Sequence, residues 1–179
     1  MRWERLFDDL EAQVAARTRL ELDAEVAERT RMERARITLG ERLVGATGAA
    51  LTLRLRGGTS ARGSLEDSGE GWILLTETGG RQLLVMTGAI LGVTGLGRPR
   101  DDTRARRFGV GSALRIISRD RRAVGVLDVD GGSAHGTIDA VGADAFDLAE
   151  HPLDSPRRPE HVHGERVIPF AAVAVITST

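Results

Sequence analysis

The stretch SARGSLEDSGEGWILLTE, residues 60–77, recurs in altered form as SAHGTIDAVGADAFDLAE at residues 133–150. Six of the eighteen aligned positions are identical, and three more are conservative replacements. The identical pairs are Ser60/Ser133, Ala61/Ala134, Gly63/Gly136, Gly69/Gly142, Leu75/Leu148 and Glu77/Glu150. Self-similarity at a fixed offset, with glycines in the same places, indicates an internal duplication. The sequence therefore predicts two structural units of similar architecture.

Short β-strands are predicted on both sides of each copy of this stretch. Leu51, Leu53 and Leu55 alternate with polar residues, which is the period of a half-buried strand. Gly57-Gly58 and Gly131-Gly132 supply tight hairpin turns, because glycine tolerates positive φ. Five short, strongly bent strands after a short helix predict a small closed barrel, which leaves no exposed sheet edge.

The fold class predicted for the whole chain is α+β, mainly β, with two tandem barrels after a long helix. Residues 1–37 hold the N-terminal helix, since no Pro or Gly occurs there and Ala, Glu, Arg and Leu dominate. The first barrel is expected over residues 38–96 and the second over residues 111–179. Residues 97–110, with Pro99 and no periodicity, are expected to form an Arg-rich linker.

One apolar stripe on the N-terminal helix is a candidate contact surface for a partner helix. Its residues recur at spacings of three and four. They are Trp3, Leu6, Phe7, Leu10 and Val14. The stripe is expected to pack against the rest of the chain or against a second copy.

The linker region is the one concentration of positive charge, because residues 97–109 hold five Arg and two Asp. Over the whole chain 25 basic residues nearly balance 26 acidic ones, so net charge does not indicate a polyanionic partner. Nucleic-acid binding through phosphate contacts is therefore assigned to a local Arg cluster. Its members are Arg104, Arg106, Arg107, Arg115, Arg119, Arg121 and Arg122.

No catalytic constellation, metal site or cofactor motif is expected. Cysteine is absent, which excludes disulfides, thiolate metal sites and cysteine nucleophiles. The glycine pairs do not precede helices and lack a following Lys-Ser/Thr, so they are not phosphate-binding loops. His161 and His163 lie in a Pro-rich stretch, where a solvated loop is the simpler interpretation than a metal site. We expect no enzymatic activity, no metal, no cofactor and no small-molecule substrate.

The sequence also lacks the patterns of export and membrane insertion. The opening MRWERLFDDLEAQ is acidic where a signal peptide has an apolar core. The longest weakly polar run, residues 83–96, is shorter than the ~20 apolar residues that a spanning helix requires. A cytoplasmic location without a membrane partner is therefore expected.

The strand and glycine pattern resembles the Sm-like small β-barrel. The phrase Arg166-Val167-Ile168-Pro169-Phe170-Ala171-Ala172-Val173 is similar to its final strand-turn-strand, and PRC-type barrels end in a similar phrase. Over the whole chain, the opening MRWERLFDDLEAQ resembles a family of uncharacterised actinobacterial proteins. Some members of that family are labelled Fis-type transcriptional regulators. Sm-like proteins usually bind RNA as ring assemblies, so this resemblance implies both assembly and nucleic acid.

Two hypotheses of function remain from the sequence. The first is a non-enzymatic interaction or assembly module whose partner is a second copy or another protein. The second is a regulatory protein that binds RNA or DNA through the Arg cluster.

Overall fold

The computed structural model describes residues 2–97, 106–155 and 157–178, apart from the side chains of residues 2–10, 12, 33, 34 and 106. The chain divides into two units, Met1–Thr38 and Leu39–Thr179. Each unit is described by itself.

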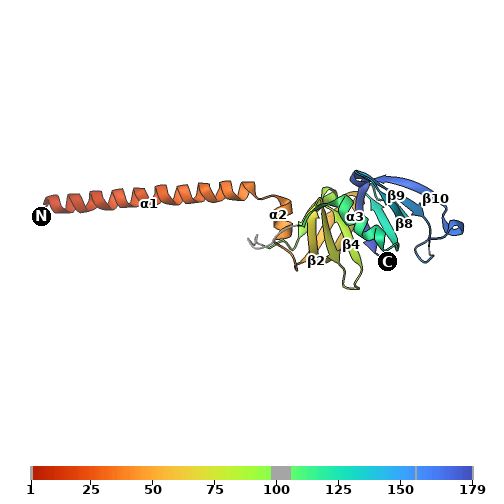
Figure 1. The fold of residues 1–179 in the computed structure, drawn as a ribbon. Helices are drawn as coiled ribbons and strands as arrows, with labels where there is room; N and C mark the ends of the chain where they lie inside the picture. The colour runs from red at the N-terminus through yellow and green to blue at the C-terminus, as the bar shows by residue number, and fades with distance from the viewer. Residues whose placement is uncertain (1, 98–105, 156, 179) are drawn as a thin grey trace. The chain divides into compact units, whose positions relative to one another are not determined.

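The first unit is one long helix, α1 (Arg2–Arg36), which confirms the predicted helix (Figure 1). Ion pairs between neighbouring turns, Arg17 with Glu21 and Arg31 with Glu28, lie in solvent, where such pairs stabilise a helix only slightly. The larger apolar side chains that are described on α1 are all exposed. They are Val14, Leu20, Leu22, Val26 and Met32.

The second unit is mainly β-structure and is built on one open sheet (Figure 1). Its helices are α2 (Leu39–Val44) and α3 (Val110–Arg119). Its strands are β1 (Ala50–Leu55), β2 (Ser60–Glu70), β3 (Trp72–Thr76), β4 (Gln82–Met86), β5 (Ile90–Thr94), β6 (Arg106–Gly109), β7 (Ala123–Asp128), β8 (Ser133–Val141), β9 (Ala145–Glu150), β10 (Gly164–Pro169) and β11 (Val173–Ser178). Short 3-10 turns are η1 (Arg56–Gly58), η2 (Thr87–Ala89), η3 (Pro159–His161) and η4 (Phe170–Ala172).

The strands follow one path through the sheet, in the order β10-β9-β8-β7-β11-β4-β3-β2-β1-β5. Neighbours on this path are antiparallel, whereas β6 lies outside it and runs parallel to β2. We name β1–β5 repeat 1 and β7–β11 repeat 2. Each repeat has the same internal order, and the two repeats join where β4 pairs with β11.

The duplication extends to the pairing of individual residues. Leu53 pairs with Val93 in repeat 1, and the corresponding Val126 pairs with Ile176 in repeat 2. An irregularity follows Leu65 in the β2–β3 pairing, and the β8–β9 pairing has one at the same place. The two repeats therefore share one register as well as one strand order.

The expectation of two closed barrels is wrong, because the sheet stays open. In repeat 1, β4 and β5 are joined only by η2, yet they lie at opposite ends of the five strands. Four residue steps span at most about 14 Å, so the five strands must curl until their outer strands approach each other. The outer strands do not pair, and the sheet instead continues from β4 into β11.

Two of the shared glycines are explained by close contact between curled strands. A Cβ atom at Gly63 would lie 2.6 Å from the carbonyl oxygen of Thr76 on β3. At the equivalent Gly136 it would meet the carbonyl oxygen of Ala149 on β9 at a still shorter distance. Any side chain at either position would push the neighbouring strand away.

The apolar core runs through both repeats without a break. Equivalent positions of the two repeats fill it, because the same alternation buries the same strand faces. The buried pairs are Leu53/Val126, Leu65/Ile138, Ile73/Phe146 and Leu75/Leu148. Repeats 1 and 2 are therefore expected to unfold together.

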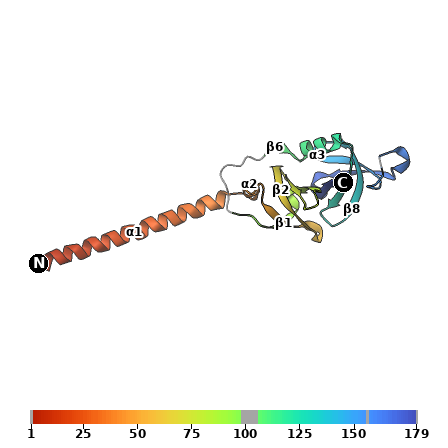
Figure 2. The same cartoon turned by 90° about the horizontal axis from the view of Figure 1, so that it is seen from below.

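Part of the predicted linker is a strand, and this corrects the expectation for residues 106–109. Strand β6 pairs with the end of β2 near Glu70. The indole nitrogen of Trp72 donates to the carbonyl oxygen of Phe108 at 3.0 Å, and the two rings stack with centroids 5.4 Å apart. Helix α3 follows β6 directly (Figure 2). Residues 98–105 of the predicted linker lie outside the described residues.

Candidate functional site

The two outermost strands of the sheet, β5 and β10, each have a strand on one side only within the described chain. The sequence of β5 is Ile-Leu-Gly-Val-Thr, without a charged residue, and Leu91 is 53% exposed. On β10, Val167 is 68% exposed between charged and apolar neighbours. An outer strand with exposed apolar side chains and unpaired backbone groups is a template for another strand.

The joint between the repeats is an example of such pairing within the chain. Val175, Ile176 and Thr177 of β11 pair with Val85, Leu84 and Leu83 of β4, respectively. The central residues are almost completely buried, with 3% of Leu84 and 2% of Ile176 exposed. The backbone nitrogen of Gln82 also donates to Ser178 Oγ at 3.0 Å.

The outer strands are the counterparts of the two strands in this joint. Leu84 pairs with Leu74 of β3, and Val167 pairs with Asp147 of β9. Leu74 and Asp147 occupy equivalent positions 73 residues apart, so β10 is the repeat 2 counterpart of β4. By the same comparison, β5 is the repeat 1 counterpart of β11. Within the described residues, β4 and β11 pair with each other in this joint, which we call the filled joint. Their counterparts β10 and β5 each keep one edge unpaired.

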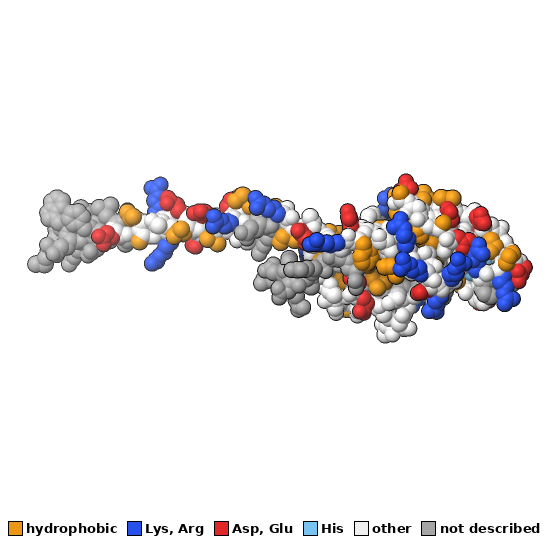
Figure 3. Space-filling model, viewed as in Figure 1, with side chains coloured by type: hydrophobic (Ala, Val, Ile, Leu, Met, Phe, Trp, Pro, Cys, Tyr) orange, Lys and Arg blue, Asp and Glu red, His pale blue; other side chains and the backbone are white. Residues whose placement is uncertain are grey.

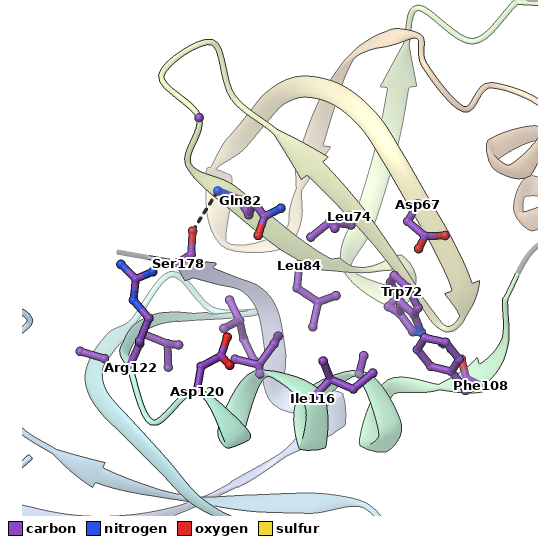
Figure 4. Close-up of a pocket in the computed structure, with 16 residues that line it drawn as sticks. Asp67, Trp72, Leu74, Gln82, Leu84, Phe108, Ile116, Asp120, Arg122 and Ser178 are labelled. Atoms are coloured by element: carbon purple, nitrogen blue, oxygen red, sulfur yellow. Dashed lines mark hydrogen bonds between the residues drawn. The ribbon is translucent and has the colours of Figure 1, made fainter.

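A groove of about 600 Å³ lies at the filled joint, between the two repeats and α3 (Figure 4). Its walls are mostly apolar and come mainly from β3, β4, β6, α3, β7 and β11. Trp72, Leu84, Phe108, Ile116 and Ile176 are among the residues that line it. A groove of this size and character fits an apolar side chain or a small ligand.

The charged groups of the groove are at its rim. Asp120 and Arg122 lie together near one end, and Asp67 lies near Trp72 at the other (Figure 4). Among the described lining residues there is no histidine, and the two carboxylates belong to different ends of the groove. This arrangement does not place a nucleophile beside a base.

The structure brings part of the predicted Arg cluster together on and around α3. Arg115 and Arg119 are one turn apart on α3, and Arg121 and Arg122 follow it. These four side chains and that of Arg107 are exposed, and Arg115 donates to the carbonyl oxygen of Gly142 at 3.1 Å. On the face in Figure 3, Arg side chains are interspersed with Asp and Glu, so positive charge there is not continuous.

Two members of the predicted Arg cluster have no described side chain. Arg104 lies outside the described residues, and only the backbone of Arg106 is described, in β6.

Arg121 has a positive φ of 49°, which lets the chain leave α3 and turn into β7.

The predicted partner-helix stripe lies on α1, and Val14 is the one member of the stripe whose side chain is described. The backbone places Trp3, Leu6, Phe7 and Leu10 in α1, and their side chains are not described. Val14 is 63% exposed.

Within the described residues, the histidines at positions 151, 161 and 163 do not form a metal site. His151 is buried, its Nε2 lies 2.8 Å from Thr137 Oγ1, and its Nδ1 lies 2.8 Å from the carbonyl oxygen of Pro152. A carbonyl oxygen only accepts, so Nδ1 carries the proton and Nε2 accepts from Thr137. Within the described ranges, no three His, Asp or Glu side chains are grouped as metal ligands. His151 thus anchors the start of this loop.

An ion pair fixes the same loop farther along. Arg157 Nη2 lies 2.5 Å from a carboxylate oxygen of Asp139 on β8. The hydrogen bond that Arg157 donates to Asp139, together with the negative charge of that carboxylate, raises the pKa of the Arg157 guanidinium above its ordinary value. Arg157 therefore stays charged and paired, and does not add to the Arg cluster around α3.

Comparisons of this chain with protein-family models, with curated proteins and with solved structures find no match. No helix in the described part of the chain combines the length and the apolar character needed to cross a bilayer.

Sequence reasoning missed the outer strands and the groove as candidate sites. The exposed residues Leu91 and Val167 lie in strands that the sequence does predict, but closed barrels would have paired both strands. The alignment of residues 60–77 with 133–150 covers neither strand, and only the pairings of the folded sheet make Val167 the counterpart of the buried Leu84.

Proposed function

We propose that this protein is a non-enzymatic assembly module built from two Sm-like units that associates with protein partners through its outer strands, β5 and β10. The observation that carries the proposal is that each outer strand has one edge unpaired within the described chain and that both strands expose apolar residues. Pairing through strand edges gives affinity from main-chain hydrogen bonds and selectivity from alternate side chains.

The composition of β5 supports this proposal. Outer strands of monomeric proteins are usually protected by lysine, by proline or by other charged residues. Strand β10 carries Glu165, Arg166 and Pro169. Strand β5 contains no charged residue or proline, and the chain has no lysine. A strand of this kind is an aggregation hazard unless a partner covers it.

The test is the molar mass of the purified protein, measured by size-exclusion chromatography with light scattering before and after nuclease treatment. We expect a nuclease-resistant species heavier than the single chain of 19.2 kDa. The double variant Leu91→Lys/Val167→Lys is expected to return to the mass of one chain, because charges on outer strands oppose pairing.

A matched control uses exposed apolar residues away from the outer strands. Ile116 on α3 and Leu153 in the loop after β9 are 55% and 40% exposed. The double variant Ile116→Lys/Leu153→Lys carries the same change of charge and should keep the mass of the wild type. A wild-type chain that is monomeric up to high concentration, or an assembly that neither double variant alters, contradicts the proposal.

A regulatory protein that binds RNA or DNA is the second candidate, and the exposed Arg side chains on and around α3 favour it. Binding through phosphate contacts should weaken steeply as salt rises. The variant with Arg106, Arg107, Arg121 and Arg122 changed to Ala should then lose binding, measured by fluorescence anisotropy with labelled single- and double-stranded oligonucleotides. Unchanged affinity in that variant argues against this candidate.

A further inference from the structure

We infer that the partner on the outer strands is a second copy of this chain, joined head to tail, with β10 of one copy paired to β5 of the next. The inference rests on the proposed function and specifies its partner and geometry. It follows from the joint inside the chain, where a strand of the β4 type pairs with a strand of the β11 type.

The internal duplication makes the two outer strands complementary. Strand β10 is the counterpart of β4, and β5 is the counterpart of β11, because each pair has the same partners in the same register. Within the described residues, one strand of each type that the joint uses therefore keeps an unpaired edge. A second copy can pair with one of these strands, and a further copy can pair with the other.

The register of the new joint follows residue by residue from the old one. Ile176 opposite Leu84 corresponds to Val93 opposite Val167 of the neighbouring copy. Thr177 opposite Leu83 corresponds to Thr94 opposite Arg166 of that copy. The third pair, Val175 with Val85, corresponds to Gly92 with Ile168.

The exposure of the side chains agrees with an unfilled joint. Val167 is 68% exposed, whereas its counterpart Leu84 is 3% exposed because β11 and α3 cover it. Pro169, which lacks a backbone N–H, is the counterpart of Met86, and Met86 lies beyond the three pairs of the joint. The proline therefore does not prevent pairing in this register.

Head-to-tail pairing differs from the symmetric alternatives in a measurable way. Pairing of β5 with β5, or of β10 with β10, would give a two-fold dimer that stops at two chains. Pairing of β10 with β5 leaves one strand of each type at the ends, so it continues until a ring closes or a fibre forms.

The experiment uses the full chain, which has no native cysteine to interfere with cross-linking. Thr94→Cys and Arg166→Cys are made as separate variants, since both side chains are exposed and opposite each other in the inferred joint. We expect a disulfide-linked dimer when the two variants are mixed under mild oxidation, and only background linkage for each variant alone. Adding Val167→Lys to the Arg166→Cys chain should abolish the mixed dimer.

An off-register pair is the matched control. Leu91→Cys mixed with Arg166→Cys places the two sulfurs about 10 Å apart along the strand, beyond the reach of a disulfide. The head-to-tail register is overturned if either cysteine variant alone forms the disulfide-linked dimer. It is also overturned if the off-register pair gives as much linked dimer as the Thr94→Cys and Arg166→Cys pair. If light scattering at the same time shows assembly that depends on Leu91 and Val167, the proposed function survives that result. If the wild type is monomeric and no pair of variants cross-links, both the head-to-tail inference and the proposed function are contradicted.

Discussion

The glycines shared by the two repeats are required by contacts that only the folded chain contains. A Cβ at Gly136 would collide with the carbonyl oxygen of Ala149, which lies on the paired strand β9. Gly79 offers a contrast, since nothing lies within 4 Å of a Cβ at that position. Glycine thus recurs at positions 63 and 136 because the neighbouring strand leaves no room for a side chain.

Gly136→Ala is expected to destabilise the fold by about 1–3 kcal/mol, which is the usual cost of overpacking a filled site. Gly79→Ala should change the free energy of unfolding by less than about 0.5 kcal/mol, as exposed substitutions usually do. Urea unfolding followed by circular dichroism measures both. Equal midpoints for the two variants would contradict the close contact at Gly136.

Thr137 and His151 form a buried hydrogen bond that repeat 1 does not have. In the variant Thr137→Val, His151 Nε2 would lose its donor while remaining buried, at a cost of about 1–3 kcal/mol. The equivalent residue in repeat 1 is the exposed Ser64, so Ser64→Ala should be nearly neutral. Unfolding in urea compares the two variants, and hydrogen exchange in residues 151–163 should rise only in the first.

At the scale of elements, α1 and the outer strands are competing explanations of assembly. Helix α1 exposes apolar residues, among them Val14 and Leu20, and it belongs to a different compact unit from the sheet. The strands β5 and β10 belong to the sheet unit, which has its own continuous core.

Removal of residues 2–36 separates these explanations. We expect the shortened chain to keep the far-ultraviolet signal of the β-sheet and the same number of chains per assembly, because β5 and β10 are unchanged. Light scattering of the shortened and full chains makes the comparison. A shortened chain that is monomeric while the full chain assembles would transfer the interface to α1.

For the whole molecule, the pairing of β4 with β11 and the shared core make the two repeats one cooperative body. In addition, the hairpin turns of the two repeats touch, since a Cβ at Gly57 would lie 2.6 Å from the backbone nitrogen of Gly131. Neither repeat can lose its structure without exposing apolar residues of the other.

Residues 39–178 are therefore expected to unfold in one transition. Hydrogen exchange with mass spectrometry across a urea series should give the same midpoint for peptides from β1–β3 and from β7–β9. Separate midpoints, with one repeat protected while the other exchanges freely, would contradict a single cooperative body.

The local pattern of the sequence determined most of the elements. The absence of Pro and Gly gave α1, alternation gave the strands, and the glycine pairs gave the hairpin turns, because these features depend on neighbours along the chain. The repeat of residues 60–77 at 133–150 likewise determined that the fold has two similar halves.

The tertiary structure alone decided how the halves meet and what remains exposed. The strand β6 forms because Trp72 and the end of β2 hold Phe108, and these contacts lie 36 residues apart in the sequence. Strand β4 pairs with β3 in either case, and whether its other edge pairs with β5 or with β11 depends on the relative energy of two closures that use the same edge. Alternation along β10 predicts a strand in either case. Only the folded sheet reveals that Val167, which pairs with Asp147 of β9, has no strand on its other side within the described chain.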